Sequence, residues 1–308
     1  MKPGFDGPSG DDVFRGLTFA FAAGILALFV ALVASLWRES LPSIQRFGFS
    51  FLTSTAWNPV EDDFGAMVAI GGTLLSTLLA MLFSVPVSIG AALFLAELAP
   101  SWMRTPFGVG IELLAAIPSI IYGMWGLFTL APLLADPLQP SLATLFGFLP
   151  LFRGPAMGIG IGTAGLVLAL MILPFITSVT RDVFLMVPQN LKEAAYGMGC
   201  TRWEVVRDVM IPYGRKGIAG GVVLGMGRAL GETMAVTFVI GNAHRFSWSL
   251  FAPGSSIAST LANEFTEADS EIYLASLVEL GLVLFLITFV ILGLAEWWLR
   301  RSTPIRAS

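Results

Sequence analysis

The chain alternates between long apolar runs and short polar segments. Four runs contain no charged residue: 17–36, 64–95, 113–135 and 154–180. Each is long enough to cross a hydrocarbon core, which a helix of about 20 apolar residues can span. Two further runs, 217–243 and 272–295, are also long enough, although they contain charged side chains. The pattern predicts six membrane-spanning helices.

Two of the apolar runs do not have the length of a simple span. Residues 141–152 are too few to cross, so we expect them at the membrane interface or in a re-entrant piece. Residues 64–95 exceed the required length, and this helix should tilt, project from the bilayer or bend at Pro86. The run 17–36 follows an acidic stretch and is too long for a cleaved signal peptide, which predicts a retained helix.

Composition supports a membrane protein. Hydrophobic residues make up 56% of the 308 positions and charged residues 12%, and the mean hydropathy is +0.81. An average soluble domain has a charged fraction of about 25%. We therefore expect an all-α integral membrane protein in contact with membrane lipid.

The distribution of Lys and Arg predicts the orientation. With segment 181–216 in the cytoplasm, six crossings put both termini inside. The basic residues on that side are Lys2, Arg15, Arg104, Arg181, Lys192, Arg202, Arg207, Arg215, Lys216, Arg300, Arg301 and Arg306. Those outside are Arg38, Arg46, Arg153 and Arg245. This bias satisfies the positive-inside rule and predicts a multi-pass protein with cytoplasmic termini.

Several chemistries lack the residues that they require. Cys200 and His244 are each the single residue of their type, so the sequence offers no internal disulfide, His-based metal cluster or Cys/His catalytic pair. No lysine lies in a Gly-rich phosphate-binding loop, and no basic patch indicates a nucleic-acid partner. We expect no enzyme activity, metal or cofactor. If ATP powers the protein, another chain must bind it.

The polar segment 181–216 contains a spaced motif formed by Glu193-Ala194-Ala195, Gly199 and Pro212. A short helix would present Ala194 and Ala195 as a flat surface that another protein can approach. Gly199 can end that helix with a positive φ, Thr201 can cap a second helix, and Pro212 is expected to end it. The full spacing resembles the EAA loop of bacterial ABC-transporter permeases, which implies that a cytoplasmic ATPase docks here.

One motif places charge inside the membrane. Residues 225–236 read GMGRALGETMAV, with Arg228 near the middle of its predicted helix. An ionised side chain there costs about 2.5–3.5 kcal/mol on insertion scales, so it has to face protein or water. Glu232 follows four positions later on nearly the same helix face and can pair with Arg228. Two interpretations stay open: the pair neutralises itself inside the bundle, or the guanidinium recognises an oxyanion.

Glycines recur at intervals of four residues along the same helix. They are Gly217, Gly221 and Gly225, followed by Gly227 and Gly231. This spacing lets another helix approach the backbone closely. We place the helix at a subunit interface that lines a central pathway, although packing within one chain explains the spacing equally well.

Three stretches resemble the PstC family of phosphate-transport permease subunits: IPSIIYGMWGLF (117–128), GRALGETMAV (227–236) and ANEF (262–265). The resemblance covers residues 64 to the C-terminus. GRALGE is shared with the sister PstA subunits, whereas the context of residues 122–125 and the TMAV ending favour PstC.

The resemblance implies a MetI-like permease fold with an extra N-terminal helix. Residues 1–63 would form that helix and a small periplasmic segment, 64–300 the permease domain with its 181–216 coupling loop, and 301–308 a cytoplasmic tail. The chain would form half of a phosphate pathway in the inner membrane, beside a PstA-like permease subunit. A cytoplasmic ATPase dimer (PstB-like) and a periplasmic phosphate-binding protein (PstS-like) would complete the importer.

The resemblance also suggests roles for individual residues. Arg228 is expected to face phosphate, and Glu232 to hold or gate the arginine. Ser119 is a candidate hydroxyl for the substrate, and Glu279 a weaker candidate for which a structural role is the alternative. ATPase coupling is expected to depend on Glu193, Ala194, Ala195, Gly199 and Pro212.

Other functions share part of this pattern. A permease for sulfate, molybdate or phosphonate would have the same loop and the same helices. A secondary transporter would need no docking loop and commonly has repeated halves. A membrane sensor of phosphate is a third alternative.

Overall fold

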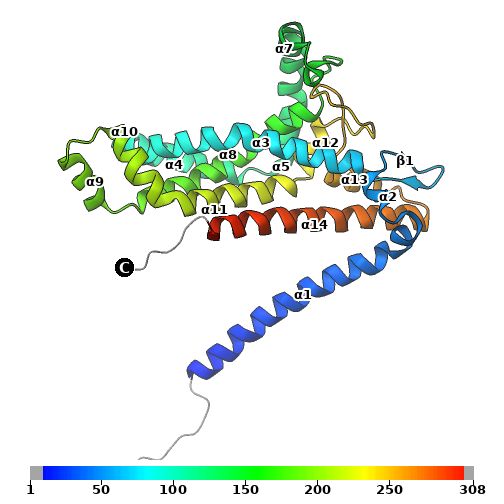
Figure 1. Cartoon of the computed structure of the whole chain (residues 1–308), viewed down its shortest axis with the longest axis horizontal. Helices are drawn as coiled ribbons and strands as arrows, with labels where there is room; N and C mark the ends of the chain where they lie inside the picture. Colours follow the sequence, from blue (N-terminus) through cyan, green and yellow to red (C-terminus); the bar gives the residue numbers. More distant parts are fainter. Residues whose placement is uncertain (1–9, 302–308) are drawn as a thin grey trace, which may run out of the picture.

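Long helices lying side by side form the body of the chain in the computed structural model, which describes residues 10–301 (Figure 1). Lys2, Arg306 and the tail from residue 302 lie outside this range. Five helical segments of the described chain are long and apolar enough to cross a membrane: Gly10–Phe47, Met67–Leu98, Ser119–Phe146, Ile161–Leu185 and Glu271–Arg301. The prediction of an all-α membrane protein is confirmed.

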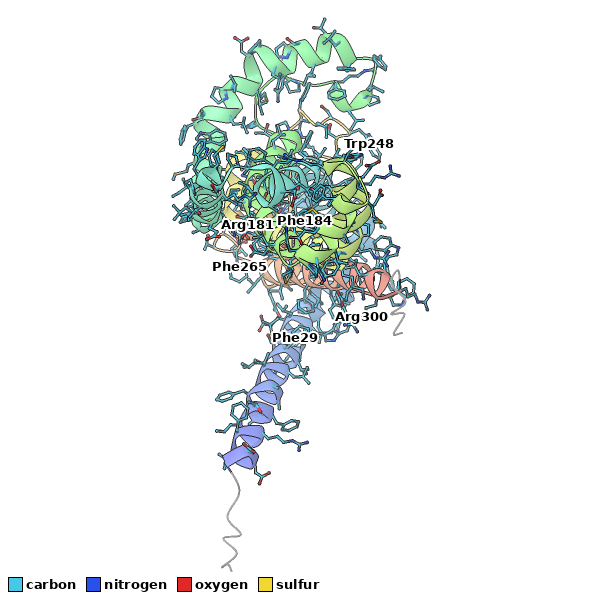
Figure 2. The ribbon with its side chains drawn as sticks, turned by 90° about the vertical axis from the view of Figure 1, so that its left-hand side faces the viewer. Phe29, Arg181, Phe184, Trp248, Phe265 and Arg300 are labelled. Carbon is cyan, nitrogen blue, oxygen red and sulfur yellow. The ribbon has the colours of Figure 1, made fainter. Side chains whose placement is uncertain are left out.

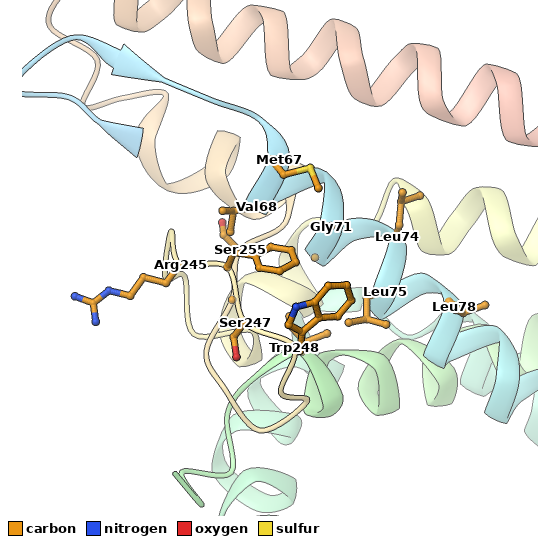
Figure 3. A pocket seen from close by; sticks show the side chains of 14 residues that line it. Met67, Val68, Gly71, Leu74, Leu75, Leu78, Arg245, Ser247, Trp248 and Ser255 are labelled. Carbon is orange, nitrogen blue, oxygen red and sulfur yellow. The ribbon is translucent and has the colours of Figure 1, made fainter. Parts of the chain in front are cut away.

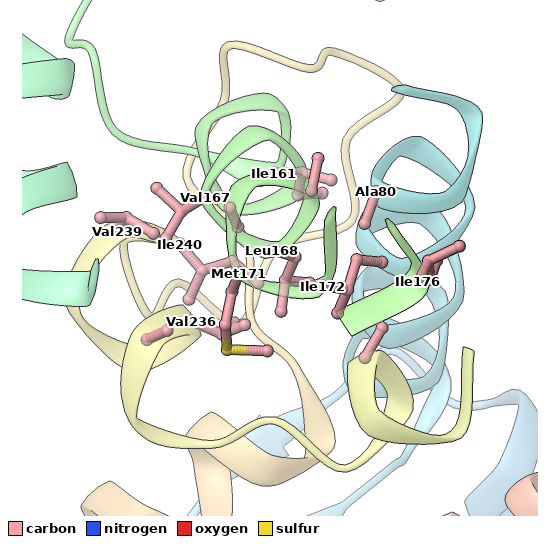
Figure 4. Packing of buried hydrophobic residues seen from close by; sticks show 14 residues of the cluster. Ala80, Ile161, Val167, Leu168, Met171, Ile172, Ile176, Val236, Val239 and Ile240 are labelled. Carbon is pink, nitrogen blue, oxygen red and sulfur yellow. The ribbon is translucent and has the colours of Figure 1, made fainter. Parts of the chain in front are cut away.

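Helix α8 (Ile161–Leu185) is the central helix of the bundle. Its side chains Leu168, Ile172 and Ile176 are fully buried, and they pack with residues of α3 (Met67–Leu93) and α12 (Met234–Val239) (Figure 4). Because α8 is surrounded by protein, two thirds of its most apolar stretch is buried, against about a quarter for α3 and α14 (Glu271–Arg301).

The predicted run 113–135 is not one helix. α4 (Ser101–Ala116) ends before Ile117, whose backbone is extended (φ −64°, ψ 131°). The cause is Pro118, because a proline disfavours the helical conformation of the preceding residue. α5 (Ser119–Trp125) then starts a new helical segment, and the sequence pattern did not predict the separate helix α4.

This second segment is longer than the sequence suggested. It continues through a π-turn (Gly126–Leu130), α6 (Ala131–Leu133) and a second π-turn (Leu134–Leu138) to α7 (Gln139–Phe146), with a kink at Asp136, whose backbone is extended (φ −145°, ψ 115°). The first half of the apolar piece 141–152 is therefore the end of this segment, and a 3₁₀ turn at Pro150–Phe152 follows. The part ending in α7 extends from the bundle on the side opposite to α1 (Gly10–Phe47) (Figures 1 and 2).

The predicted helix 217–243 is interrupted. α11 (Ile211–Leu230) lies beside α3, α8 and α14, but it stops at Leu230, and α12 begins only at Met234. Gly231, Glu232 and Thr233 separate the two helices, although hydropathy continues across the break. α11 with α12 is the candidate for the sixth crossing, which is not among the five apolar segments above.

A half-buried carboxylate joins the elements at the end of the bundle opposite to the 181–216 segment. Here lie α2 (Ser50–Thr53), the antiparallel strands β1 (Trp57–Asn58) and β2 (Asp63–Phe64), and α13 (Ile257–Glu264). Glu264 accepts hydrogen bonds from Trp57 Nε1 (2.6 Å) and Tyr273 Oη (2.7 Å), and its other oxygen lies 2.7 Å from His244 Nε2. Burial opposes ionisation of Glu264, but these three partners hold its pKa below the usual value.

Candidate transport site and docking segment

Arg228 lies in the last turn of α11 with its side chain exposed. Within residues 10–301, no ion pair or hydrogen bond of its guanidinium is found. The residues one and two turns before it are Leu224, which is 60% exposed, and Gly220, which has open space at its Cβ position. One face of α11 is thus uncovered in the single chain, and Arg228 is its charged group.

The predicted pairing of Glu232 with Arg228 is wrong. The break after Leu230 removes the continuous helix that would have aligned the two side chains. Glu232 Oε1 instead accepts a hydrogen bond from the backbone N–H of Ala235 (3.2 Å) at the start of α12. The first N–H groups of a helix have no partner within the helix, so an acceptor here stabilises α12.

α5 brings a second motif to the same place. At Gly123, an added Cβ would lie 2.9 Å from the Cα of Ala235, so α5 and α12 are in close backbone contact. Tyr122 interacts electrostatically with Arg228, and its hydroxyl donates to the carbonyl of Leu114 (2.9 Å). Ser119 lies one turn before Tyr122 and is half-buried. The two motifs that resembled the PstC family therefore meet at the junction of α5, α11 and α12.

Glu279 is not part of this junction. It is buried in α14, where it faces Ser43 of α1, and the Ser43 hydroxyl also lies 3.0 Å from that of Ser276. α14 meets the Arg228 region through Leu292, which contacts Gly227 and lies more than three helical turns further along. These contacts favour the structural alternative for Glu279, as part of the contact between α1 and α14.

Most of the glycine stripe of α11 serves packing inside this chain. Side chains of α8 approach the Cβ positions of three of its glycines: Gly217 and Val183, Gly221 and Val179, Gly225 and Ile176. The assignment of this stripe to a subunit interface is therefore wrong. The uncovered face of α11 is the one that contains Gly220, Leu224 and Arg228.

The docking segment begins with α9 (Gln189–Gly197), which has an outer and an inner face. Glu193 and Ala194 are exposed, as predicted for a surface that meets a partner. Ala195 is only 3% exposed and packs with Val205 and Val206, so its expected place on that surface is wrong. Ala195 lies three residues after the buried Lys192, and both point inward because α9 rests on the ends of the membrane helices.

The predicted turn after α9 is confirmed. Gly199 has φ +88°, which favours glycine. Thr201 caps α10 (Arg202–Glu204), and its backbone N–H donates to Glu204 Oε2 (2.7 Å). The Thr201 backbone and hydroxyl donors lower the pKa of Glu204.

Pro212 does not end the second helix. α10 passes through a π-turn (Val205–Met210) directly into α11, in which Pro212 occupies the first turn. Proline has no backbone N–H to donate, and the π-turn directly before it shifts the helical hydrogen bonds by one residue, so the helical segment continues past Pro212.

The sequence interpretation missed an ion pair beneath α9. Lys192 Nζ lies 2.9 Å from Glu97 Oε2, and Tyr196 Oη donates to Glu97 Oε1 (3.2 Å). Lys192 and Tyr196 are four residues apart, the spacing of one helix face. That spacing indicates a shared partner for Lys192 and Tyr196, but it does not identify Glu97, which lies 95 positions before Lys192 in the chain.

An apolar cavity beside α3 is poorly suited to an oxyanion. It measures about 330 Å³ and is lined by residues including Met67, Leu75 and Trp248. The side chain of Arg245 points away from it (Figure 3). The junction around Arg228 is therefore the better candidate for the path of an anion.

Comparison with known proteins identifies the family. Residues 84–303 match the family described as "Binding-protein-dependent transport system inner membrane component". A phosphate transport system permease protein PstC from Mesorhizobium japonicum is 56% identical over 94% of this chain and 90% of that protein. The corresponding protein of Pasteurella multocida is 55% identical over 94% and 91%, respectively.

Solved structures agree on the fold. A chain of the MetNI methionine ABC transporter superposes with a TM-score of 0.56 at 17% identity, over 77% of this chain and 95% of that one. A bacterial ABC transporter for the polysaccharide alginate gives 0.54 at 17% identity, over 95% and 99%. The chain therefore has an ABC-importer permease fold, and it belongs to the inner-membrane components of binding-protein-dependent transport systems, in the PstC family.

Proposed function

We propose that this chain is the permease subunit of an ATP-driven importer and forms half of a transmembrane pathway for inorganic phosphate, with Arg228 facing the anion. The observation that carries the proposal is the exposed Arg228 in a membrane helix, without an ionic partner in residues 10–301. A charged group in hydrocarbon is costly, so water, an anion or a second subunit must cover it.

The surroundings favour recognition of an anion over internal neutralisation. Glu232 is engaged by the start of α12, so it does not cancel the charge of Arg228. The guanidinium has several N–H donors in a planar fork, which suits the oxygens of phosphate. Tyr122 is anchored to Leu114 and borders the charge, and Ser119 is the nearby candidate hydroxyl on α5. The names of the PstC relatives favour phosphate over sulfate, molybdate or phosphonate.

The partners follow from the uncovered surfaces. The open face of α11 would meet a second, PstA-like permease subunit, which would complete the pathway. The outer face of α9, with Glu193 and Ala194, would meet a cytoplasmic PstB-like ATPase dimer, and a periplasmic PstS-like protein would deliver phosphate at the opposite end. Residues 1–63 would supply an additional membrane helix and a small periplasmic segment, residues 64–300 the permease domain, and both termini would be cytoplasmic.

The test uses the complete transporter reconstituted in lipid vesicles. R228A should reduce uptake of labelled phosphate about 10- to 100-fold, the effect of losing hydrogen bonds to a charged group. R228K should lie between R228A and wild type, because lysine keeps the charge without the planar fork. R300A is the matched control, since Arg300 is exposed and forms its ion pair with Glu296 one turn away.

Two outcomes would count against the proposal. Normal uptake by R228A would remove Arg228 from the pathway. Stronger inhibition of uptake by unlabelled sulfate or molybdate than by unlabelled phosphate would assign the pathway to another oxyanion.

A further inference from the structure

The ion pair between α9 and the end of α3 is built more firmly than a surface contact. Lys192 is 7% exposed, and the Glu97 side chain is 16% exposed. The two oxygens of Glu97 have separate partners, Lys192 and Tyr196. Burial raises the pKa of Tyr196, and Glu97 raises it further, so the phenol stays protonated and can donate.

The position of Glu97 in α3 is unusual. It lies in the π-turn Phe94–Leu98, where the backbone N–H of Ala99 donates to the carbonyl of Phe94 (2.7 Å). A π-turn inserts one residue into the helical repeat and so changes the direction of the side chains that follow. Here the π-turn follows α3 directly, and the carboxylate of Glu97 within it binds Lys192 and Tyr196 of α9.

α9 rests on a second π-turn as well. Ala195 packs in a buried cluster with Val205 and Val206 of the turn Val205–Met210, and with Ala92 and Ala96 at the end of α3. That turn leads directly into α11, the helix of Arg228. The inner face of α9 is therefore held by a polar contact to α3 and by an apolar contact to the start of α11.

The outer face of the same helix is free in the single chain. Glu193 follows Lys192 directly, and neighbouring residues of a helix point about 100° apart. An ATPase bound to Glu193 and Ala194 would thus move a helix whose inner face contacts the end of α3 and the π-turn that leads into α11. A helix with only apolar contacts could slide, whereas a directional ion pair with two donors resists sliding.

We propose that the contact of Glu97 with Lys192 and Tyr196 transmits the movement of α9 to α3, so that α9 and the end of α3 move as one body during transport. Glu97 is a positioning residue in this proposal, because it touches neither phosphate nor ATP. The proposal rests on the proposed function, since it assumes that an ATPase docks on α9.

The first experiment measures phosphate taken up per ATP hydrolysed, in vesicles that contain the complete transporter. E97Q and K192Q should keep the ATPase bound but lower this ratio about tenfold, a typical effect of mutations on coupling. The charge-exchanged double variant E97K/K192E should recover a large part of the loss, because it restores the ion pair, while retained ATPase binding in the single variants separates a role in coupling from a role in folding. E296Q is the control, because Glu296 forms an exposed ion pair with Arg300.

An unchanged ratio in E97Q and K192Q would overturn the proposal, and so would loss of ATPase binding in step with uptake. If wild-type vesicles hydrolyse ATP without taking up phosphate, the proposed function fails instead. A second measurement tests the coupling proposal separately from the proposed function, because it does not depend on phosphate transport.

The second experiment measures the distance between spin labels on cysteines introduced at two exposed positions, Leu98 and Met198, with Cys200 replaced by alanine so that it takes no label. In the wild-type background this distance should be the same with and without bound ATP, because the two segments move together. In E97Q it should change on ATP binding. A change of similar size in the wild-type background would show that α9 moves independently of α3 and would overturn the proposal.

Discussion

Single carboxylates in this chain are defined by the donors around them rather than by their neighbours in the sequence. Glu232 lies four positions from Arg228, yet it binds the backbone at the start of α12. Glu264 gathers Trp57, Tyr273 and His244 from three other segments. Glu279 faces α1 instead of the α5–α11–α12 junction. In each case the nearest suitable donor in space determines the role of the carboxylate.

Glu264 gives a prediction for stability. Its pKa is depressed in the folded chain, so ionised Glu264 stabilises the fold above the ordinary carboxyl pKa of 4.5, and this contribution is lost as pH falls through the folded pKa. E264Q should lose about 1–3 kcal/mol at neutral pH, the cost of weakening hydrogen bonds to a charged group that is partly buried. Hydrogen exchange of residues 50–66 at pH 7 and pH 4 measures the effect.

The wild-type segment should exchange faster at pH 4 than at pH 7 after correction for intrinsic rates. E264Q should exchange quickly at both pH values. Equal protection of wild type and E264Q at pH 7 would show that the ionised carboxylate does not hold this region together. D63N is the control, since Asp63 is exposed on β2.

At the scale of elements, the docking segment depends on one backbone conformation. Gly199 has φ +88° and nothing within 4 Å of its Cβ position, so a larger residue there causes backbone strain without a clash. G199V should therefore change the angle between α9 and α10 and weaken co-purification of the ATPase about tenfold, as expected for a strain of about 1–2 kcal/mol. E193K should weaken it through the reversed charge on the outer face.

The control for both variants is N190A on the same helix, where the exposed side chain of Asn190 is shortened without a change of charge. ATPase recovered with G199V and E193K in the same amount as with wild type would contradict docking at α9. The amount of permease recovered from the membrane is measured in the same co-purification. A loss of permease indicates misfolding, whereas a loss of ATPase alone indicates failed docking.

The sequence predicted elements well where hydropathy alone decides them. The helices α1, α3, α8 and α14 each contain most of one predicted apolar run, because the part of a helix that crosses lipid requires that composition. Their ends were not predicted: α1 extends from Gly10 to Phe47, well beyond the run 17–36. Hydropathy does not register a break between apolar residues, so the interruption after Leu230 and the end of α4 before Pro118 were missed.

In the candidate site and the docking segment, too, local features could be predicted from the sequence, whereas contacts between distant segments could not. Arg228 was a candidate from the sequence because an intramembrane charge stands out in an apolar run, and its role in transport stays a prediction. Gly199 and the cap at Thr201 were predictable because their conformations are local. The partner of Glu232 was wrong and that of Lys192 was missed, since one depends on a helix break and the other on a contact across 95 positions.

At the scale of the whole molecule, the orientation in the membrane is the property on which the assignment of all partners depends. The bundle has one end with α9 and α10 and an opposite end with β1 and β2 (Figure 1). Basic residues are concentrated toward the first end, which predicts that α9 lies in the cytoplasm. An ATPase can reach Glu193 only with this orientation, and a periplasmic binding protein can reach the opposite end only with the same orientation.

Thiol labelling tests this orientation because the chain has a single cysteine. Cys200 is half-buried and lies between the exposed residues Gly199 and Thr201. A membrane-impermeant maleimide should label it in inside-out vesicles without the ATPase, and should leave it unlabelled in intact spheroplasts. The variant C200A/V60C supplies the opposite control, because Val60 is 93% exposed beside β1 and should react only from the outside. The opposite result would be labelling of Cys200 in spheroplasts, together with labelling of C200A/V60C only in inside-out vesicles. It would reverse the orientation, and the ATPase could then not dock on α9.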